Sequence, residues 1–274
     1  MMDARESLRE TLAAPAREGM ALAVSGGLDS RLLAWLLLGL RLPFTALHVR
    51  GPHVPPWESE GAVAWLAEHG VPFHVLDLDP LTLGPVRENA RDRCYHCKRY
   101  LFAAMREKAD SLGPPHLLDA TNASDLGEYR PGLQALRELG VRSPLAELGI
   151  GKPDIRALAA QHGLSDPDQP SRACALTRFP YGHAIGRADL DLLLRAEYRV
   201  ESLGVREFRL RLPAPGQVLL QLPRHAECGE SLLDRLRNEI QNVYGIVPEI
   251  VFSERLSGFY DTQPDPAQSG PRRS

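Results

Sequence analysis

The chain has 274 residues, of which 43% are hydrophobic and 24% are charged, and its formal net charge at pH 7 is -3. This composition predicts a globular protein with one large and one smaller domain, and it excludes a largely disordered chain. The negative balance excludes a general attraction for long polyanions, so nucleic acid is not an expected partner. The longest strongly apolar run, Leu32 to Leu40, is far shorter than the roughly 20 residues that a membrane-spanning helix needs. No secretory signal is visible, so we expect a cytoplasmic protein without a membrane partner.

The first half of the chain alternates apolar strands with helical patterns. We predict strands at residues 20–24, 43–49, 71–76 and 116–119, helices at residues 4–17, 57–68 and 94–112, and a further helix that begins at Asp29 or Ser30 and ends at Leu40. Strands that alternate with helices form parallel sheets. The sequence therefore predicts an α/β fold with a Rossmann-like parallel sheet covered by helices on both faces.

The second half predicts loops and short helices up to residue 182, including a helix at residues 153–162, and then a small α+β domain at the C-terminal end. Its expected elements are a helix at residues 187–203, strands near residues 208–212 and 218–222, a helix at residues 230–243 and a strand at residues 249–252. Residues 261–274 contain too few apolar side chains to fold, so we predict a disordered tail. The predicted domains are residues 1–182, residues 183–260 and this tail.

A short polar loop, Ser25-Gly26-Gly27-Leu28-Asp29-Ser30, connects the first predicted strand to the next helix. Gly26 and Gly27 let the backbone approach an anion, and the amide groups at the helix start point at it with the positive end of the helix dipole. Ser25 and Ser30 can add hydroxyl donors, and Asp29 can bind Mg²⁺. An ordinary strand-to-helix turn with an Asp or Ser cap is the alternative. We interpret the six residues together as a site for nucleotide phosphates.

The segment after the fourth predicted strand also carries polar side chains. Ligands of open parallel sheets bind beyond the carboxyl ends of the strands, so residues 119–125 are expected beside the Ser25 loop. Asn122 and Asp125 are suited to ribose or Mg²⁺ there, although both can be simple turn residues. Arg130 precedes Pro131 and can reach a phosphate.

Cys174 is the first candidate for a reactive side chain. It lies in an irregular stretch with Arg172 and Arg178 close in sequence, and such cations favour the thiolate form. A buried core cysteine is the alternative.

Cys94 and Cys97 form a Cys-x-x-Cys pair, and four cysteines in so long a chain do not make a disulfide scaffold. With Cys174 as the third ligand, the pair can bind three irons of a [4Fe-4S] cluster and leave the fourth iron open. A zinc site completed by Cys228 or His96 is a second reading, and inert cysteines on one helix face are a third.

Arg209 and Arg211 are two residues apart on a predicted strand, so both guanidinium groups point to the same side. Two such groups can bind a phosphate or a carboxylate in bidentate fashion. A solvated strand face is the alternative.

Several segments together resemble a known superfamily. The Ser25–Ser30 loop is similar to the signature loop of the N-type ATP pyrophosphatases, and it is not a Walker loop because no Gly-Lys-Ser/Thr follows. With residues 93–98, 119–132, 140–145 and 174–182, the chain from about residue 20 to residue 211 resembles the LarE-type sulfur transferases. These enzymes insert sulfur into a pyridinium dicarboxylate mononucleotide during assembly of the nickel-pincer cofactor.

The resemblance implies an enzyme that uses ATP and Mg²⁺ to adenylate a substrate carboxylate, releases pyrophosphate and takes its sulfur from Cys174. It also implies that Glu197, Arg209 and Arg211 serve substrate or metal binding, that the partner is a small phosphorylated pyridinium compound, and that the chain forms a homo-oligomer. If Cys174 donates its own sulfur, it becomes dehydroalanine and each chain donates once. If a [4Fe-4S] cluster carries the sulfur, Cys174 is a ligand and turnover is catalytic. Beyond Arg211 the resemblance weakens, and Glu227 is the nearest carboxylate there.

Three other functions stay open on the residues alone. Thiolation of tRNA would replace carboxylate adenylation with base adenylation, but the acidic balance and the absence of an obvious RNA-binding extension speak against it. Amide ligation fed by ammonia would need a glutaminase domain or partner, which this sequence does not show. A nucleotide-binding regulator without turnover would lack pyrophosphate release dependent on Asp29.

Overall fold

A computed structural model describes residues 4–127, 131–171 and 173–261. Contacts divide this chain into unit 1, which contains the residues up to Pro80 together with Asp92–Ser171, and unit 2, which contains Leu81–Arg91 and the described residues from 173 onward. This division differs from the predicted boundary after residue 182 in two places, because residues 173–182 and Leu81–Arg91 both belong to unit 2. None of the helices in the described ranges has the length and apolar character needed to cross a bilayer.

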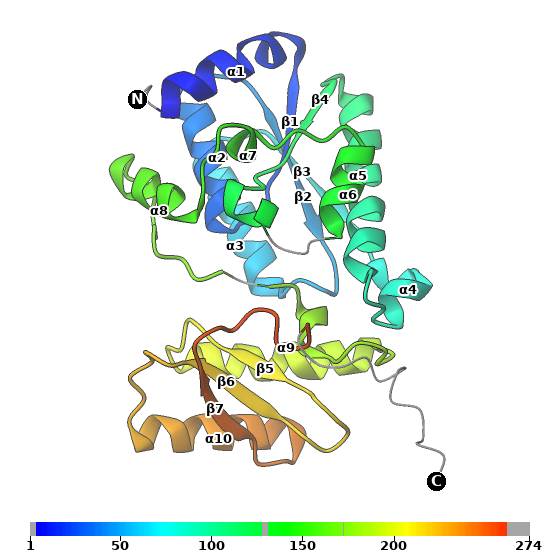
Figure 1. The fold of residues 1–274 in the computed structure, drawn as a ribbon, viewed down its shortest axis with the longest axis vertical. Helices are drawn as coiled ribbons and strands as arrows, with labels where there is room; N and C mark the ends of the chain where they lie inside the picture. The colour runs from blue at the N-terminus through cyan, green and yellow to red at the C-terminus, as the bar shows by residue number, and fades with distance from the viewer. Residues whose placement is uncertain (1–3, 128–130, 172, 262–274) are drawn as a thin grey trace. The chain divides into compact units, whose positions relative to one another are not determined.

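Unit 1 is built, within its described residues, on a sheet of four parallel strands. They are β1 (Met20–Ala23), β2 (Thr45–Arg50), β3 (Phe73–Asp77) and β4 (His116–Leu118). Their order is β3-β2-β1-β4, so β1 pairs with β2 on one side and with β4 on the other (Figure 1). All four strands lie where the sequence predicts them. The loops after β1 and β4 therefore leave the same edge at the point where the strand order reverses, which is where open parallel sheets bind ligands.

Helices cover both faces of this sheet, as predicted, and the residues of β1 show why (Figure 1). Side chains alternate along a strand, so Met20 and Leu22 join a core cluster with α1, α2, α3, α7 and α8 while Ala21 joins a second cluster with α5 and α6. The bounds are α1 (Ala4–Glu18), α2 (Leu28–Gly39), α3 (Pro56–Glu68), α5 (Arg93–Leu112), α6 (Gly132–Glu138), α7 (Pro144–Glu147) and α8 (Lys152–Gln161). The apolar run Leu32 to Leu40 belongs to α2 and its end, and it is apolar because most of it faces the core.

Unit 2 contains a three-stranded sheet and three α-helices among its described residues. The strands are β5 (Arg209–Arg211), β6 (Leu219–Pro223) and β7 (Glu249–Ser253), and the helices are α4 (Gly84–Arg87), α9 (Arg187–Ser202) and α10 (Glu230–Tyr244). β6 is the central strand, antiparallel to β5 and parallel to β7. The predicted small α+β fold is confirmed. Helix α9 buries Leu190, Leu193 and Val200 at helical spacing, and the one carboxylate on that buried stripe is Glu197.

The segment Leu81–Arg91 belongs to unit 2 because Asn89 holds it there. Asn89 is fully buried with a left-handed φ of 52°, and its side-chain amide donates to the carbonyl oxygens of Phe179 at 3.0 Å and Pro180 at 2.7 Å. Its own carbonyl accepts from the amide of Gly182 at 3.1 Å. Three hydrogen bonds to a segment some 90 residues later outweigh proximity in sequence to β3.

Candidate functional site

The turn after β1 requires a glycine at its first position for two separate reasons. Gly26 has a φ of 87°, which L side chains rarely adopt. A Cβ atom on Gly26 would also lie 2.7 Å from the Cβ of Ala62 in α3. The turn is thus packed directly against α3, and the contact with Ala62 fixes the path of its backbone.

Gly27 is different, because nothing in the protein requires a glycine there. It is exposed and extended, with φ -70° and ψ 161°, and a Cβ on it would meet only the Ser25 hydroxyl at 3.5 Å. Gly27 is the N-cap of α2, and no side chain caps that helix end. The first amide groups of α2 have no intrahelical acceptor, and the missing side chain lets a ligand come close to them. The space above Gly27 therefore suits an anion such as a nucleotide phosphate.

The two hydroxyl groups predicted for the loop take different positions. Ser30 is buried, and its hydroxyl donates to the carbonyl of Gly27 at 3.0 Å, so it closes the turn from inside. Ser25 is exposed and lies 3.3 Å from the Ser30 hydroxyl and 3.4 Å from the amide of Gly27. Of the two, Ser25 presents its hydroxyl to a ligand and Ser30 shapes the loop.

The segments after β1 and β4 meet through Asp29 and Asn122. The side-chain amide of Asn122 donates to the carboxylate of Asp29 at 2.8 Å. Asn122 has no solvent exposure and its amide oxygen has no protein partner, while Asp29 is partly exposed. Asp125 is also buried and accepts the backbone amide of Asn122 at 3.3 Å. The structure thus brings Asp29, Asn122 and Asp125 together, and the geometry makes Asn122 the residue that orients Asp29.

Two buried polar residues, His48 and Asp119, hold these loops, and the sequence interpretation gave neither of them a role. His48 Nδ1 lies 2.8 Å from the carbonyl of Val24, which can only accept, so Nδ1 carries the hydrogen and Nε2 accepts from the hydroxyl of Ser59 at 2.6 Å. Burial lowers the pKa of His48, in keeping with this neutral form. Asp119 accepts from the hydroxyls of Thr121 and Ser143, both at 2.5 Å. The sequence around His48 and Asp119 shows that both residues are polar, but it does not indicate which distant groups they contact.

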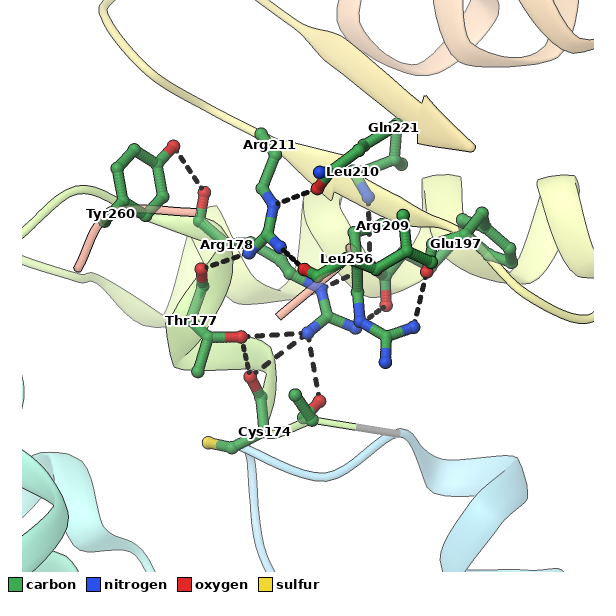
Figure 2. Close-up of polar contacts among 12 residues, drawn as sticks. Cys174, Thr177, Arg178, Glu197, Arg209, Leu210, Arg211, Gln221, Leu256 and Tyr260 are labelled. Atoms are coloured by element: carbon green, nitrogen blue, oxygen red, sulfur yellow. Dashed lines mark hydrogen bonds and ion pairs between the residues drawn. The ribbon is translucent and has the colours of Figure 1, made fainter. Parts of the chain in front are cut away.

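Cys174 lies in unit 2 at the start of a 3-10 turn, Ala175–Arg178, and is partly exposed rather than buried in the core. Its carbonyl oxygen accepts from the amide of Thr177 at 3.0 Å, the hydroxyl of Thr177 at 2.8 Å and Nη1 of Arg178 at 3.3 Å. Figure 2 shows the sulfur turned away from these contacts. These three hydrogen bonds fix the backbone of Cys174. Arg172, the other cation predicted near it, lies outside the described residues.

Arg178 and Glu197 form a buried ion pair that supports the same turn. Arg178 Nε and Nη2 lie 2.7 and 3.3 Å from the two carboxylate oxygens of Glu197, and each side chain is 5% exposed. Glu197 also accepts the backbone amide of Leu210 at 3.4 Å. The charge of Arg178 is thus compensated by Glu197, and the pair connects α9 and β5 to the Cys174 turn (Figure 2).

Arg209 and Arg211 are buried, at 7% and 2% exposure, so the interpretation as a solvated strand face is wrong. Arg211 donates from Nε to Gln221 at 3.1 Å, from Nη1 to the carbonyl of Thr177 at 2.7 Å and from Nη2 to the carbonyl of Leu256 (Figure 2). Burial, followed by the charges of Arg178 and Arg209, lowers the pKa of Arg211 to about 9.

The charges of unit 2 are unbalanced at this place. Among the described residues whose charges act on the pKa of Arg211, Arg178 and Arg209 are the cations and Glu197 is the carboxylate, which is paired with Arg178. An excess of positive charge in a poorly solvated region attracts anions, because water screens it weakly. The network is therefore suited to lie near a phosphate or carboxylate group of a substrate.

Cys94 and Cys97 lie in the first turn and a half of α5, three residues apart on one helix face. Cys94 is exposed and Cys97 is partly exposed, so neither is a core residue. His96 contacts the carboxylate of Asp92 at 3.1 Å, and Cys228 is partly exposed with its pKa raised by burial. No three His, Cys, Asp or Glu side chains gather into a metal-binding group in the part of the chain that is described. Both the cluster and the zinc site stay predictions, and Arg130 lies outside the described residues.

No family model matches this chain, but it is similar to several known proteins. The uncharacterized protein slr1717 of Synechocystis sp. is 36% identical over 193 residues, which cover 69% of this chain and 71% of the relative. The uncharacterized protein MJ0830 of Methanocaldococcus jannaschii is 30% identical over 193 residues, or 69% and 73%. Pyridinium-3,5-bisthiocarboxylic acid mononucleotide synthase of Lactiplantibacillus plantarum is 29% identical over 228 residues, 82% of each chain. The chain therefore belongs to the family that contains slr1717 and MJ0830.

Proposed function

We propose that this protein is an ATP-dependent sulfur transferase of the LarE type, which converts a carboxylate of a pyridinium dicarboxylate mononucleotide into a thiocarboxylate. The observation that carries the proposal is its 29% identity, over 82% of both chains, to the pyridinium-3,5-bisthiocarboxylic acid mononucleotide synthase of Lactiplantibacillus plantarum. The loop after β1 and the partly exposed Cys174 supply the two functions that such a reaction needs, phosphate binding and a sulfur nucleophile.

The first half of the proposed reaction activates the carboxylate. The amide groups at the Gly26–Gly27 turn and the hydroxyl of Ser25 bind the β- and γ-phosphates of ATP, and Asp29, oriented by Asn122, binds Mg²⁺. A carboxylate oxygen of the substrate attacks the α-phosphorus, and the bond to the β-phosphate oxygen breaks. Pyrophosphate leaves, and an acyl-adenylate forms. Adenylation turns the carboxylate oxygen into part of a good leaving group, AMP.

The second half transfers sulfur. The thiolate of Cys174 attacks the acyl carbon, the acyl-oxygen bond to AMP breaks, and a thioester joins substrate and enzyme. Loss of the proton on the Cα of Cys174 then expels the thiocarboxylate through cleavage of the Cβ–S bond. Cys174 becomes dehydroalanine, so one chain donates one sulfur. The partial exposure of the thiol and the fixed backbone beneath it favour this role.

Arg209 and Arg211, with Glu197 and Arg178, are proposed to provide the positive region in which the anionic substrate is held. The buried excess of positive charge supports this role. Arg211 already donates to three protein acceptors, so we assign it to the shape and charge of the region rather than to direct bidentate binding.

A second sulfur source is favoured by one observation, the position of Cys94 and Cys97 on one accessible face at the start of α5. With Cys174 they would supply three thiolate ligands to a [4Fe-4S] cluster, which would carry exchangeable sulfide on its open iron. Cys174 would then be a ligand and would not be consumed.

The test follows a single incubation of anaerobically purified protein with ATP, Mg²⁺ and pyridinium-3,5-biscarboxylic acid mononucleotide. We expect pyrophosphate release and a chain mass reduced by one sulfur and two hydrogens at Cys174. The Cys174→Ala variant should release pyrophosphate without sulfur transfer, and Asp29→Asn should release little. Iron and acid-labile sulfide in the starting sample, with the mass of Cys174 unchanged after thiolation, would favour the cluster. Pyrophosphate release with tRNA but not with the pyridinium compound would overturn the proposed substrate.

A further inference from the structure

The segment Ser165–Gln169, called the strap below, is hydrogen-bonded to the turn that begins the phosphate loop. Gln169 Nε2 donates to the carbonyl oxygen of Gly26 at 3.3 Å, and Gln169 Oε1 accepts from Nη2 of Arg31 at 2.8 Å. A guanidinium group only donates and a carbonyl only accepts, so chemistry fixes which end of the amide faces which partner. Gln169 therefore bridges α2 and the Gly26 carbonyl in one orientation.

Arg31 holds the other end of the strap. This side chain of α2 is 7% exposed and donates from Nη1 to the carbonyl and hydroxyl of Ser165 at 3.0 and 3.3 Å, and from Nη2 to the carbonyl of Asp166 at 3.5 Å. The atoms that accept from Arg31 are all neutral oxygens, and burial lowers the pKa of Arg31, while the nearby charge of Asp166 partly offsets that effect. A buried guanidinium bound to neutral oxygens is a costly way to gain stability. Its clear effect is to hold the strap in place beside the loop.

The bond to Gly26 controls the direction of the next amide group. The Gly26–Gly27 peptide is trans, so its carbonyl oxygen and the N–H of Gly27 point in opposite directions. Peptides between glycines rotate easily, since no Cβ atoms restrict them. By binding the oxygen on one side, Gln169 turns the N–H of Gly27 to the other side, where it donates to the exposed hydroxyl of Ser25 at 3.4 Å.

Five positions separate Gln169 from Cys174, which limits the distance between their Cα atoms to about 18 Å however the chain is extended. We infer that Gln169 is a positioning residue, which orients the Gly26–Gly27 peptide for ATP phosphates and makes the segment leading to Cys174 respond to occupation of the loop. This inference rests on the proposed function. If phosphate binding tightens the Gln169 bond, an ordered strap must in turn favour phosphate binding, because such coupling is reciprocal.

The experiment measures ATP binding and the reactivity of Cys174 in the full chain. Binding of Mg-ATP is titrated by calorimetry, and alkylation of Cys174 by iodoacetamide is followed by peptide mass spectrometry with and without Mg-ATP. Gln169→Met removes both bonds without adding charge. Gln169→Glu keeps an acceptor for Arg31 but places an acceptor against the Gly26 carbonyl. Asp168→Ala is the control, because Asp168 is the neighbouring residue, is 82% exposed and pairs only at the surface with Arg156.

We expect Mg-ATP to change the alkylation rate of Cys174 in the unchanged protein and in Asp168→Ala. Both Gln169 variants should bind Mg-ATP about threefold to tenfold more weakly, as expected for one lost hydrogen bond, and should lose the effect of ATP on alkylation. Gln169→Glu should show both effects with an unchanged Tm. An unchanged Tm would exclude unfolding as the cause of the weaker binding.

Two results would overturn the inference alone: Gln169 variants that bind Mg-ATP as tightly as the unchanged protein, or an alkylation rate that ATP leaves unaltered while it binds. Failure of the unchanged protein to bind Mg-ATP would remove the proposed function as well.

Discussion

The side-chain amide of Asn122 donates a 2.8 Å hydrogen bond to the carboxylate of Asp29, a residue 93 positions earlier in the sequence. This bond joins the loop after β1 to the segment after β4, and it fixes the orientation of the Asp29 carboxylate at the edge of the sheet. Because the amide oxygen of Asn122 is buried without a protein partner, the donor end of the side chain is the end that matters here. The proposed binding of Mg²⁺ by Asp29 should therefore depend on Asn122, even if Asn122 does not contact the ligand.

Replacement of Asn122 by alanine should reduce ATP-dependent pyrophosphate release about tenfold, since groups that orient a metal ligand contribute on that order. Asn122→Asp should be worse, because a second carboxylate beside Asp29 repels it and favours its protonated form. A pyrophosphate-release assay at saturating ATP measures both. Asn238→Ala, at an exposed position of α10, is the matched control and should leave the rate unchanged. A wild-type rate in Asn122→Ala would show that Asp29 needs no support.

Substitutions of the two loop glycines should have different effects: Gly26→Ala should mainly lower stability, and Gly27→Ala should mainly weaken Mg-ATP binding. Gly26→Ala forces a residue with a φ of 87° to carry a Cβ that meets Ala62, so the free energy of unfolding should fall by about 1–3 kcal/mol. Gly27→Ala has an ordinary φ and open space, so its Tm should stay within about 2 °C of the unchanged protein. The methyl group of Gly27→Ala should nevertheless weaken Mg-ATP binding, because it fills the space above the helix amides. Urea unfolding and calorimetric titration test the pair, and equal behaviour of the two variants in both assays would contradict this division.

We expect that replacing Glu197 mainly lowers the free energy of unfolding, because Glu197 is the buried partner of Arg178. In Glu197→Ala the buried guanidinium of Arg178 loses its carboxylate, and removal of one partner of a buried pair costs about 3–5 kcal/mol. Arg199→Ala, in the same helix, breaks an ion pair with Glu239 in which the side chains are 52% and 29% exposed, and it should cost at most about 1 kcal/mol. Urea unfolding of both variants gives the comparison. A Glu197→Ala protein as stable as Arg199→Ala, but inactive, would instead indicate a direct catalytic role.

Stability should fall in mild acid because of His53. Burial lowers the pKa of His53 to about 4, whereas the unfolded side chain titrates near 6.5. Between these values the unfolded chain binds a proton that the folded chain does not, so the free energy of unfolding decreases as pH falls from 6.5 to 4. The contribution of this residue is about 3 kcal/mol over that window. Urea unfolding from pH 7 to 4.5 should show a shallower decline in His53→Gln than in the unchanged protein. Parallel curves would contradict the assignment.

The sequence predicted the elements of unit 1 well because local patterns determine them. A short continuous apolar run marks β1, a longer one marks α2, and the glycine pair marks the turn between them. The sheet edge that gathers Asp29 and Asn122 follows from parallel strands alone. These features need no knowledge of which distant side chains meet.

The missed features depend on distant partners. The bond from Gln169 to Gly26 spans 143 positions, and Arg31 looked like the polar end of an apolar run. Arg211 looked like a solvent-facing or ligand-binding residue, because period-two spacing tells which side chains share a face but not whether Gln221 and two carbonyls occupy it. Propensity cannot supply such contacts, which depend on tertiary packing.

The hydrogen bonds of Asn89 also bear on how the protein is made. A ribosome adds about 5–20 residues per second, so Asn89 is synthesised roughly 5 to 20 seconds before Phe179 and Pro180, its partners 90 positions later. During that interval the segment Leu81–Arg91 lacks the partners that hold it in unit 2, while β3 can already pair with β2 and β4 with β1. Slow elongation between these points would therefore prolong a state in which unit 2 is only partly assembled.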